Sequence, residues 1–401
     1  MENTLPKKQR KIIQNPVLII TISGFLIRLG LLISMLTVLS DFTEPYFIAD
    51  DIKYEKLAYT YMQNAGSFID ISFFNKITAG YLQTFWPWIM CITSYIFKSV
   101  YASRYINIIL SALCIPVLYS LTYRISENKK TAITACSLFA FLPVTVLTST
   151  FPIKDIFITF GVFYVLDVLV TIQKGQRPEI SKIIISIILL VCIYFTRGAV
   201  SEILLLIFAV FYMQRFKKEK NHVALCITAF LCLIALLLFG NGIFSAFDTK
   251  IETYSGYGTT ESGALSFRIN SITDSYKLPF TYFFATLQPL RTNLFTESTA
   301  SVWLDILAYA NISIYPIAIG NFIYIFKKKK NLFFWLSTII FYCAVIILSL
   351  GIFRHYLFLL PVQIINFALF LEQDRKNNLI ITLALSMLML SGIFLLSMLT
   401  I

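Results

Sequence analysis

Long apolar runs recur along the whole chain, and they constrain its fold more than any other feature. About eleven of them reach the roughly 17–25 residues that an α-helix needs to span a bilayer. Because a helix satisfies its own backbone hydrogen bonds where no water is present, each run is expected to be a transmembrane helix. Of the 401 residues, 58% are hydrophobic and only 13% are charged. We therefore expect an all-α, polytopic integral membrane protein, with residues 1–401 forming a single transmembrane domain.

The chain has a net charge of +12, and its basic residues are concentrated in short polar breaks between the apolar runs. The breaks richest in Lys and Arg are residues 7–11, 124–130, 173–182, 214–222, 327–331 and 372–378. The positive-inside rule places all of them in the cytoplasm, with the N-terminus inside and the C-terminus outside. The basic residues are therefore a topology signal, and we expect membrane lipids as surroundings and no nucleic-acid partner.

One apolar run must stay out of the membrane if this topology holds. Residues 17–123 contain three apolar runs where only two crossings fit between cytoplasmic breaks. The run at 82–97, LQTFWPWIMCITSYIF, is the shortest and contains a proline and two tryptophans. Because Trp and Tyr favour the membrane interface, we predict a juxtamembrane or re-entrant segment there. The first outer loop then covers residues 41–104, and a second, long outer loop covers 241–302.

Ionisable side chains gather at the outer ends of the predicted helices. Charges at an apolar boundary are expensive and usually face a cavity or a partner. Carboxylates beside guanidinium groups suit a reaction in which a base activates a hydroxyl while cations hold a phosphorylated leaving group. The outer-face residues are Asp50, Asp51, Lys154, Asp155, Arg197, Arg268, Lys277, Arg291, Arg354 and His355.

Most of these residues also have a structural interpretation. Adjacent acids in a loop are commonly solvated, and the Lys154–Asp155 pair is as consistent with a local ion pair that stops a helix as with ligand binding. Arg354 and His355 are equally consistent with side chains that snorkel at a helix start. Arg197 favours function, because a break as short as FTRG between two apolar runs has no need of a charge.

The first loop and the helix before it resemble the GT-C superfamily of membrane glycosyltransferases, especially its protein-mannosyltransferase-like and aminoarabinose-transferase-like members. GFLIRLGLL resembles their first helix. IADDIKYEKLA resembles their acidic form D-E-x-x-Y-x-x-x-A, with Asp50, Asp51, Tyr54 and Ala58 at the matching positions and Asp in place of Glu at 51. Residues 103–125, 141–157 and 353–362 resemble later segments of the same proteins.

The resemblance implies a GT-C-like fold with juxtamembrane helices in the first outer loop. It also implies that Asp50 is the catalytic base, with Asp51 as its catalytic neighbour. Added to the outer-face charges, it gives a set of expected substrate-binding residues: Tyr54, Lys154, Asp155, Arg197, Arg268, Arg291, Arg354 and His355. The scheme requires no cofactor and no metal, although an acidic pair is compatible with a divalent cation.

The expected substrates are a sugar carried on a polyprenyl phosphate or diphosphate and a saccharide or lipid acceptor hydroxyl. The expected place is the extracytoplasmic face of a bacterial inner membrane, in assembly of surface polysaccharide or glycolipid. A Wzy-type O-antigen or capsule repeat-unit polymerase is an alternative, since such enzymes use the same class of donor and FATLQPLRTNLFTE resembles proteins grouped with them. A lipid-linked oligosaccharide flippase is a third possibility, but it would need charges along several spans, and only Arg28 and Asp167 lie within predicted spans.

Overall fold

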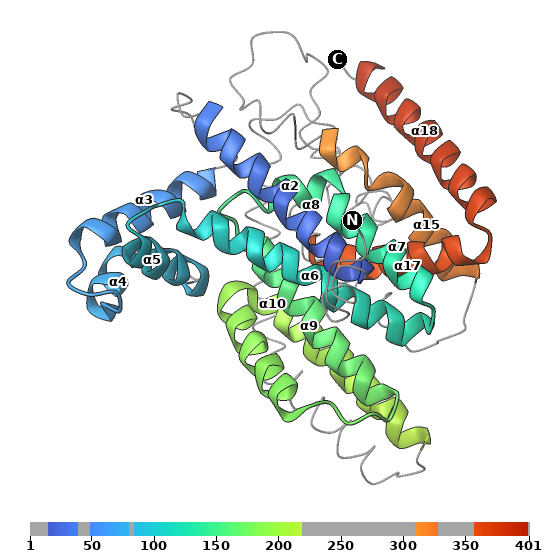
Figure 1. The fold of residues 1–401 in the computed structure, drawn as a ribbon, viewed down its shortest axis with the longest axis horizontal. Coiled ribbons are helices and arrows are strands. Elements are labelled where there is room, and N and C mark those ends of the chain that lie inside the picture. Colours follow the sequence, from blue (N-terminus) through green and yellow to red (C-terminus); the bar gives the residue numbers. More distant parts are fainter. Residues whose placement is uncertain are drawn as a thin grey trace, which may run out of the picture.

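The computed structural model is helical almost throughout the part of the chain that it describes, which is residues 15–38, 49–79, 84–218, 306, 309–327 and 357–399 (Figure 1). The helices of this part, in chain order, are α2 (Pro16–Val38), α3 (Ala49–Asn64), α4 (Ile71–Ile77), α5 (Phe85–Phe97), α6 (Ala102–Ser126), α7 (Lys129–Phe141), α8 (Pro143–Thr148), α9 (Asp155–Gln173), α10 (Ile180–Lys218), α15 (Tyr315–Lys327), α17 (Leu360–Gln373) and α18 (Arg375–Leu399).

Four helical stretches of this part are long and apolar enough to cross a membrane: Pro16–Thr37, Ala102–Ser126, Asp155–Gln173 and Ile180–Gly198. They agree with the predicted all-α polytopic class. The total of about eleven spans stays a prediction, because several of the apolar runs fall in 219–305 and 328–356, outside the described residues. The long outer loop predicted at 241–302 lies there as well.

Helix α6 is the centre of the packing. It lies against α2, α7 and α9, which all contribute to the main core. Ile115 and Leu118 of α6 are fully buried in that core. Phe139 of α7 and Phe163 of α9 meet edge to face with their ring centroids 5.3 Å apart. The apolar faces of α2, α6, α7 and α9 are therefore buried in one another.

A proline breaks the helix that follows α6. Pro143 has no amide hydrogen and its ring clashes with the carbonyl four residues earlier, so α7 stops short and α8 starts anew. The freed carbonyls of Phe139 and Ala140 accept hydrogen bonds from the fully buried Arg28 guanidinium, at 3.3 and 2.8 Å. A cation at a helix C-terminus also meets the negative end of the helix dipole. Arg28 thus ties α2 to the broken end of α7.

Helix α10 folds back on itself at Arg197, whose backbone is extended (φ −160°, ψ 86°). Beyond this break, the Ser201 hydroxyl donates to the Leu190 carbonyl before it, at 3.1 Å. In a continuous helix these two residues would lie about 16 Å apart along the axis, so the two halves must lie side by side. The break predicted from FTRG is confirmed.

The described part of the first predicted outer loop folds into α3, α4 and α5, which lie together at one side of the molecule (Figure 1). Helix α5 has 13 residues, a length of about 20 Å. The hydrocarbon core of a bilayer is about 30 Å thick. The length therefore favours the prediction that the apolar run at 82–97 does not cross the membrane.

Helices α15, α17 and α18 form the C-terminal group of the described residues. Gly320 on α15 lies directly against the ring of Phe367 on α17. A Cβ atom at position 320 would lie 2.8 Å from Cε2 of that ring and 3.3 Å from Thr382 on α18. Real Cβ atoms do not approach so closely, so the backbone contact requires glycine here. Nearby, the Asn366 amide donates to Asn321 Oδ1 at 2.7 Å inside the same interface.

We predict that Gly320→Ala lowers the thermal midpoint of the purified chain, because overpacking a tight interface costs about 1–3 kcal/mol. The matched control is Gly30→Ala on α2, where a new Cβ meets nothing within 4 Å. That control should keep or raise the midpoint, since alanine favours helix over glycine. Fluorescence-detected unfolding in detergent measures both. Equal midpoints for the two variants would contradict the packing described for α15 and α17.

Candidate active site

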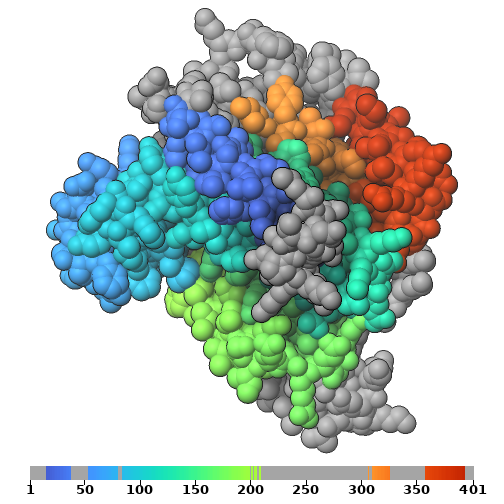
Figure 2. Space-filling model, in the orientation of Figure 1, coloured from blue at the N-terminus to red at the C-terminus, as the bar shows by residue number. Residues whose placement is uncertain are grey.

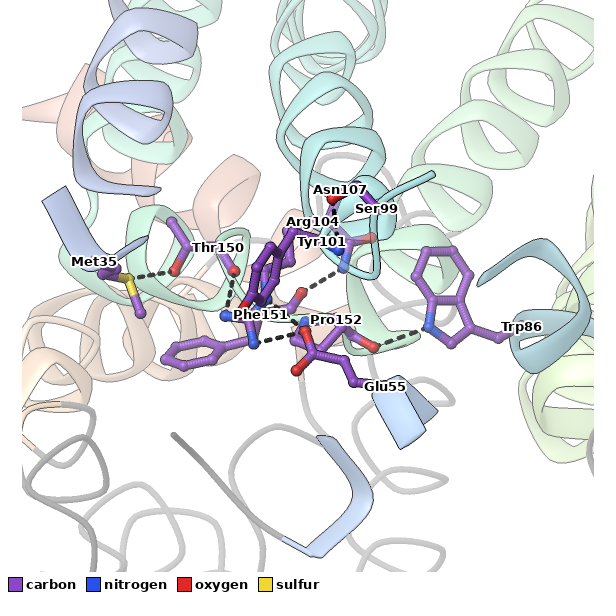
Figure 3. A network of polar contacts seen from close by, with 10 residues as sticks. All are labelled: Met35, Glu55, Trp86, Ser99, Tyr101, Arg104, Asn107, Thr150, Phe151 and Pro152. Atoms are coloured by element: carbon purple, nitrogen blue, oxygen red, sulfur yellow. Dashed lines mark hydrogen bonds and ion pairs between the residues drawn. The ribbon is translucent and has the colours of Figure 1, made fainter. Parts of the chain in front are cut away.

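The segment between α8 and α9 is a buried loop held by side chains from other helices (Figure 3). Backbone carbonyls cut off from water need donors. The Asn107 amide of α6 donates to the carbonyls of Phe151 and Ile153, at 2.6 and 2.8 Å. The Trp86 indole of α5 donates to the carbonyl of Pro152 at 3.0 Å. The loop is therefore fixed by α5 and α6 just before α9 begins.

Arg104 joins this loop to the helix that carries the acidic pair. Its guanidinium is 1% exposed and lies 2.7 Å from Oε1 of Glu55 on α3. The same guanidinium donates to the Thr150 carbonyl at 3.4 Å (Figure 3). Removing two charges from water is costly unless they are paired and hydrogen-bonded. The contact therefore holds α3, α6 and the loop in one arrangement.

The structure places the predicted catalytic acids in the first turn of α3. On a helix, residues four apart share a face. Asp51 is thus one turn from Glu55, and Asp50 is one turn from Tyr54, which is buried in the main core. The side chains of Asp50 and Asp51 lie outside what the structure describes. Their role as base and neighbour stays a prediction, supported by where their backbone lies.

Asp155 and Arg197 form an ion pair that joins α9 to the break in α10. Arg197 Nη1 lies 3.4 Å from Asp155 Oδ1, and both side chains are largely buried. Asp155 stands in the first turn of α9, where a carboxylate is favoured by the helix dipole. Lys154 precedes it as the residue that begins the helix. Two charged breaks that are 42 residues apart in sequence therefore meet.

The other predicted binding residues lie outside the described part of the chain. Arg268, Arg291, Arg354 and His355 fall in residues 219–305 and 328–356, so their roles stay predictions. Within the described residues, no three His, Cys, Asp or Glu side chains are grouped so that they could hold a metal ion. Of the predicted residues, the structure brings Asp155 and Arg197 into contact, and Tyr54 lies on α3, which Glu55 and Arg104 join to the loop before α9.

Sequence reasoning missed the residues that build this region: Trp86, Glu55, Arg104, Asn107 and Thr150. Both charged residues stand at conspicuous positions in the sequence: Arg104 begins an apolar run, and Glu55 follows Asp51 by one helical turn. What the sequence lacked was any indication that they pair, because the contact joins residues that are 49 apart.

Solved structures share this fold. An oligosaccharyltransferase of Archaeoglobus fulgidus in its apo form matches with a TM-score of 0.51 and 16% identity, covering 89% of this chain and 50% of that one. The oligosaccharyltransferase AglB of the same archaeon, in complex with an inhibitory peptide and a dolichol-phosphate, matches with a TM-score of 0.50 and 16% identity, covering 90% and 50%. The chain has the fold of part of an archaeal oligosaccharyltransferase.

The chain spans about half the length of these structures. No family model and no curated protein matches it. At 16% identity the likeness concerns the fold alone, and the predicted resemblance to the GT-C superfamily stays a prediction. The protein-mannosyltransferase-like and aminoarabinose-transferase-like resemblances stay predictions.

We predict that Arg104→Met destabilises the chain strongly, because removing one partner of a buried ion pair costs about 3–5 kcal/mol. Glu55→Gln should also destabilise, and the double variant should lose less than the sum of the two, since both act on one contact. Glu127→Gln is the matched control, because Glu127 pairs with Lys174 at 2.6 Å but is well exposed. Thermal unfolding in detergent measures all four. Equal thermal midpoints for Arg104→Met and Glu127→Gln would contradict the prediction that the buried pair contributes more to stability than the exposed pair.

Proposed function

We propose that the chain transfers a glycosyl group from a polyprenyl-phosphate- or polyprenyl-diphosphate-linked donor to an acceptor hydroxyl on the extracytoplasmic face of a bacterial membrane. The observation that carries the proposal is that Arg104 and Glu55 join the acid-bearing helix α3 to the loop before α9, the helix whose first residue, Asp155, pairs with Arg197. The fold likeness to an oligosaccharyltransferase solved with a dolichol-phosphate supports the class of donor.

In this scheme Asp50 is the general base. It accepts the proton of the acceptor hydroxyl as the hydroxyl oxygen attacks the anomeric carbon of the donor sugar. The bond between that carbon and the phosphate oxygen breaks, and its electron pair leaves with the phosphate. Asp51 is the adjacent carboxylate at the next position of α3. Tyr54, one turn further along α3, would border the sugar.

Cations stabilise the departing phosphate in the same scheme. Arg197 is fixed by Asp155, so its guanidinium is already oriented when the lipid phosphate arrives. Lys154 adds a second positive charge at the start of α9. The predicted residues Arg268, Arg291, Arg354 and His355 would complete the phosphate site from the long loop and the segment before α17. The scheme uses no cofactor, and the acidic pair remains compatible with a divalent cation.

The charges at the opposite ends of the same helices support an outer location for the site. Arg104 stands near the start of α6 and Arg124 near its end. Arg124 pairs with Asp167 at 3.1 Å, and Lys174 pairs with Glu127 at 2.6 Å. Arg124, Glu127 and Lys174 belong to the basic breaks that the positive-inside rule places in the cytoplasm. The site at the other end then faces outward.

The charges inside the predicted spans favour an enzyme over a flippase. Arg28 makes its hydrogen bonds to backbone carbonyls and to the Ser111 and Thr145 hydroxyls. Asp167 accepts from Ser120 as well as from Arg124. Both side chains thus hold helices together, whereas a translocation path would need charges that line a route across the bilayer.

A repeat-unit polymerase of the Wzy type is the second candidate. It shares the class of donor and the outer cations with the favoured proposal, and it differs in the size of the group transferred. The size of the lipid-linked intermediate that accumulates when the chain is inactive therefore distinguishes the two candidate functions. A complete repeat unit indicates a polymerase, and a truncated unit indicates a single-sugar transferase.

We predict that Asp50→Asn and Arg197→Ala each abolish complementation of a strain that lacks the chain, and that the lipid-linked donor accumulates. Loss of a general base lowers the rate by about 100-fold or more. Surface polysaccharide and lipid-linked intermediates, resolved by size, are the readout.

Two variants serve as matched controls for that experiment. Asp374→Asn changes an acid that caps α18, where asparagine caps equally well. Arg177→Ala removes an exposed arginine at the other end of the helices. Both should complement fully. Full activity of Asp50→Asn and Arg197→Ala, with all variants inserted to the same level, would refute the proposed site.

A further inference from the structure

The turn between α3 and α4 is built around two side chains, Asp70 and Tyr61. The Asp70 carboxylate accepts from the amides of Phe73 at 3.0 Å and Gly66 at 3.1 Å. The fully buried Tyr61 hydroxyl accepts from the Asp70 amide at 2.6 Å and donates to the Phe68 carbonyl at 3.3 Å. The Phe73 and Gly66 amides also lower the pKa of Asp70. Asp70 is therefore ionised at neutral pH, and the turn has one defined shape.

This defined turn presents apolar side chains to the outside. Phe68, Ile69 and Ile71 are 50, 47 and 58% exposed, and Asp70 between them is held by its hydrogen bonds to the Phe73 and Gly66 amides. At the end of α5, Ile96 and Phe97 are 53 and 69% exposed. We call these five residues the apolar tip. Contiguous exposed apolar patches mark interaction sites. The three large apolar side chains that this turn exposes therefore indicate such a site.

The two halves of the apolar tip lie at the same end of the α3–α5 unit. The Tyr61 ring contacts Phe73 of α4 with centroids 6.0 Å apart and Tyr95 of α5 with centroids 6.2 Å apart. Tyr61 thus stands between the turn and the end of α5. In Figure 2 the unit projects from the rest of the molecule, at the left of the view.

The apolar tip adjoins the place where a candidate span begins. Helix α6 starts at Ala102, five residues after Phe97, so the two lie within about 18 Å of each other. Tyr101 and Tyr105, at the start of α6, are 38 and 41% exposed. Exposed tyrosines at the end of a span mark the level of the lipid headgroups.

Two lysines lie beside the apolar tip, as expected for a segment at the level of the lipid headgroups. Lys98 places its ammonium 3.9 Å from the centre of the Tyr95 ring. Lys76 is exposed on α4. Apolar and aromatic groups that enter the acyl boundary, with lysines beside them, are typical of segments that lie in a membrane interface.

We propose that the apolar tip inserts into the outer leaflet of the same bilayer that α6 crosses, and that its partner is phospholipid. Helix α3 is then held at one end by the bilayer and at the other by Arg104. This arrangement fixes the height of the start of α3 above the lipid surface. The inference depends on α6 as a membrane span and is independent of any glycosyl transfer.

Photo-crosslinking in native membranes tests the proposal. A benzophenone-bearing phenylalanine analogue replaces Phe68 or Phe97 in the full chain, and the adducts formed on illumination are identified by mass. Lys56, which is exposed on α3 away from the apolar tip, is replaced in the same way as the control. Phospholipid adducts should form at positions 68 and 97 several-fold more than at position 56.

Two results would overturn the proposal. Equal lipid yields at positions 68, 97 and 56 would mean that the apolar tip has no special contact with the bilayer. Crosslinks from positions 68 and 97 into another protein would assign the patch to a protein partner instead. Substitution at these exposed positions leaves the Asp70 and Tyr61 hydrogen bonds in place, so folding is retained, and an equal thermal midpoint for all three variants verifies this.

Discussion

The buried ion pair between Arg104 and Glu55 is the contact on which the rest of the candidate site depends. Arg104 begins the central helix α6, and its guanidinium is almost wholly removed from water. Such a charge is tolerated only with a partner, so α3 must remain where Glu55 can reach it. Because the same guanidinium also meets the Thr150 carbonyl, the loop before α9 is fixed by the same contact.

Charged and polar side chains gather where the helices break. Pro143 ends α7, Pro152 lies in the loop before α9, and Arg197 stands where α10 turns back. A break frees backbone groups that must find other partners. Arg28, Asn107 and Trp86 supply them. The chain therefore gathers polar side chains at helix ends, and the spans between them remain apolar.

Much of this was predictable from the sequence, because charges are conspicuous in an apolar chain. The FTRG break and the position of Asp155 at a helix end both followed from charged residues between long apolar runs. The helical class followed from the length of the runs. Asp50 and Asp51 also stood out as outer-face charges, but the role of Asp50 as base depended on a family resemblance and stays a prediction; the structure adds that both lie in the first turn of α3.

Other features could not be read from the sequence, since they depend on tertiary contacts. Lys154 was the expected neighbour of Asp155, but the structure adds Arg197 as an ion-pair partner from another helix. In the sequence, Arg28 is an isolated charge within a predicted span. Only the structure shows that it donates hydrogen bonds to the carbonyls freed by Pro143. The pairing of Glu55 with Arg104 has no local signal at all.

The most direct test of the central claim compares two arginines of the same helix. Arg104→Met removes the contact at the proposed site, and Arg124→Met removes an ion pair at the opposite end of α6. The measurement is the amount of lipid-linked donor that accumulates in cells carrying each variant, relative to the amount of folded chain in the membrane. We predict accumulation for Arg104→Met and none for Arg124→Met. Equal accumulation of the lipid-linked donor in cells carrying the two variants, at equal amounts of folded chain, would contradict the claim that Arg104 holds the site together.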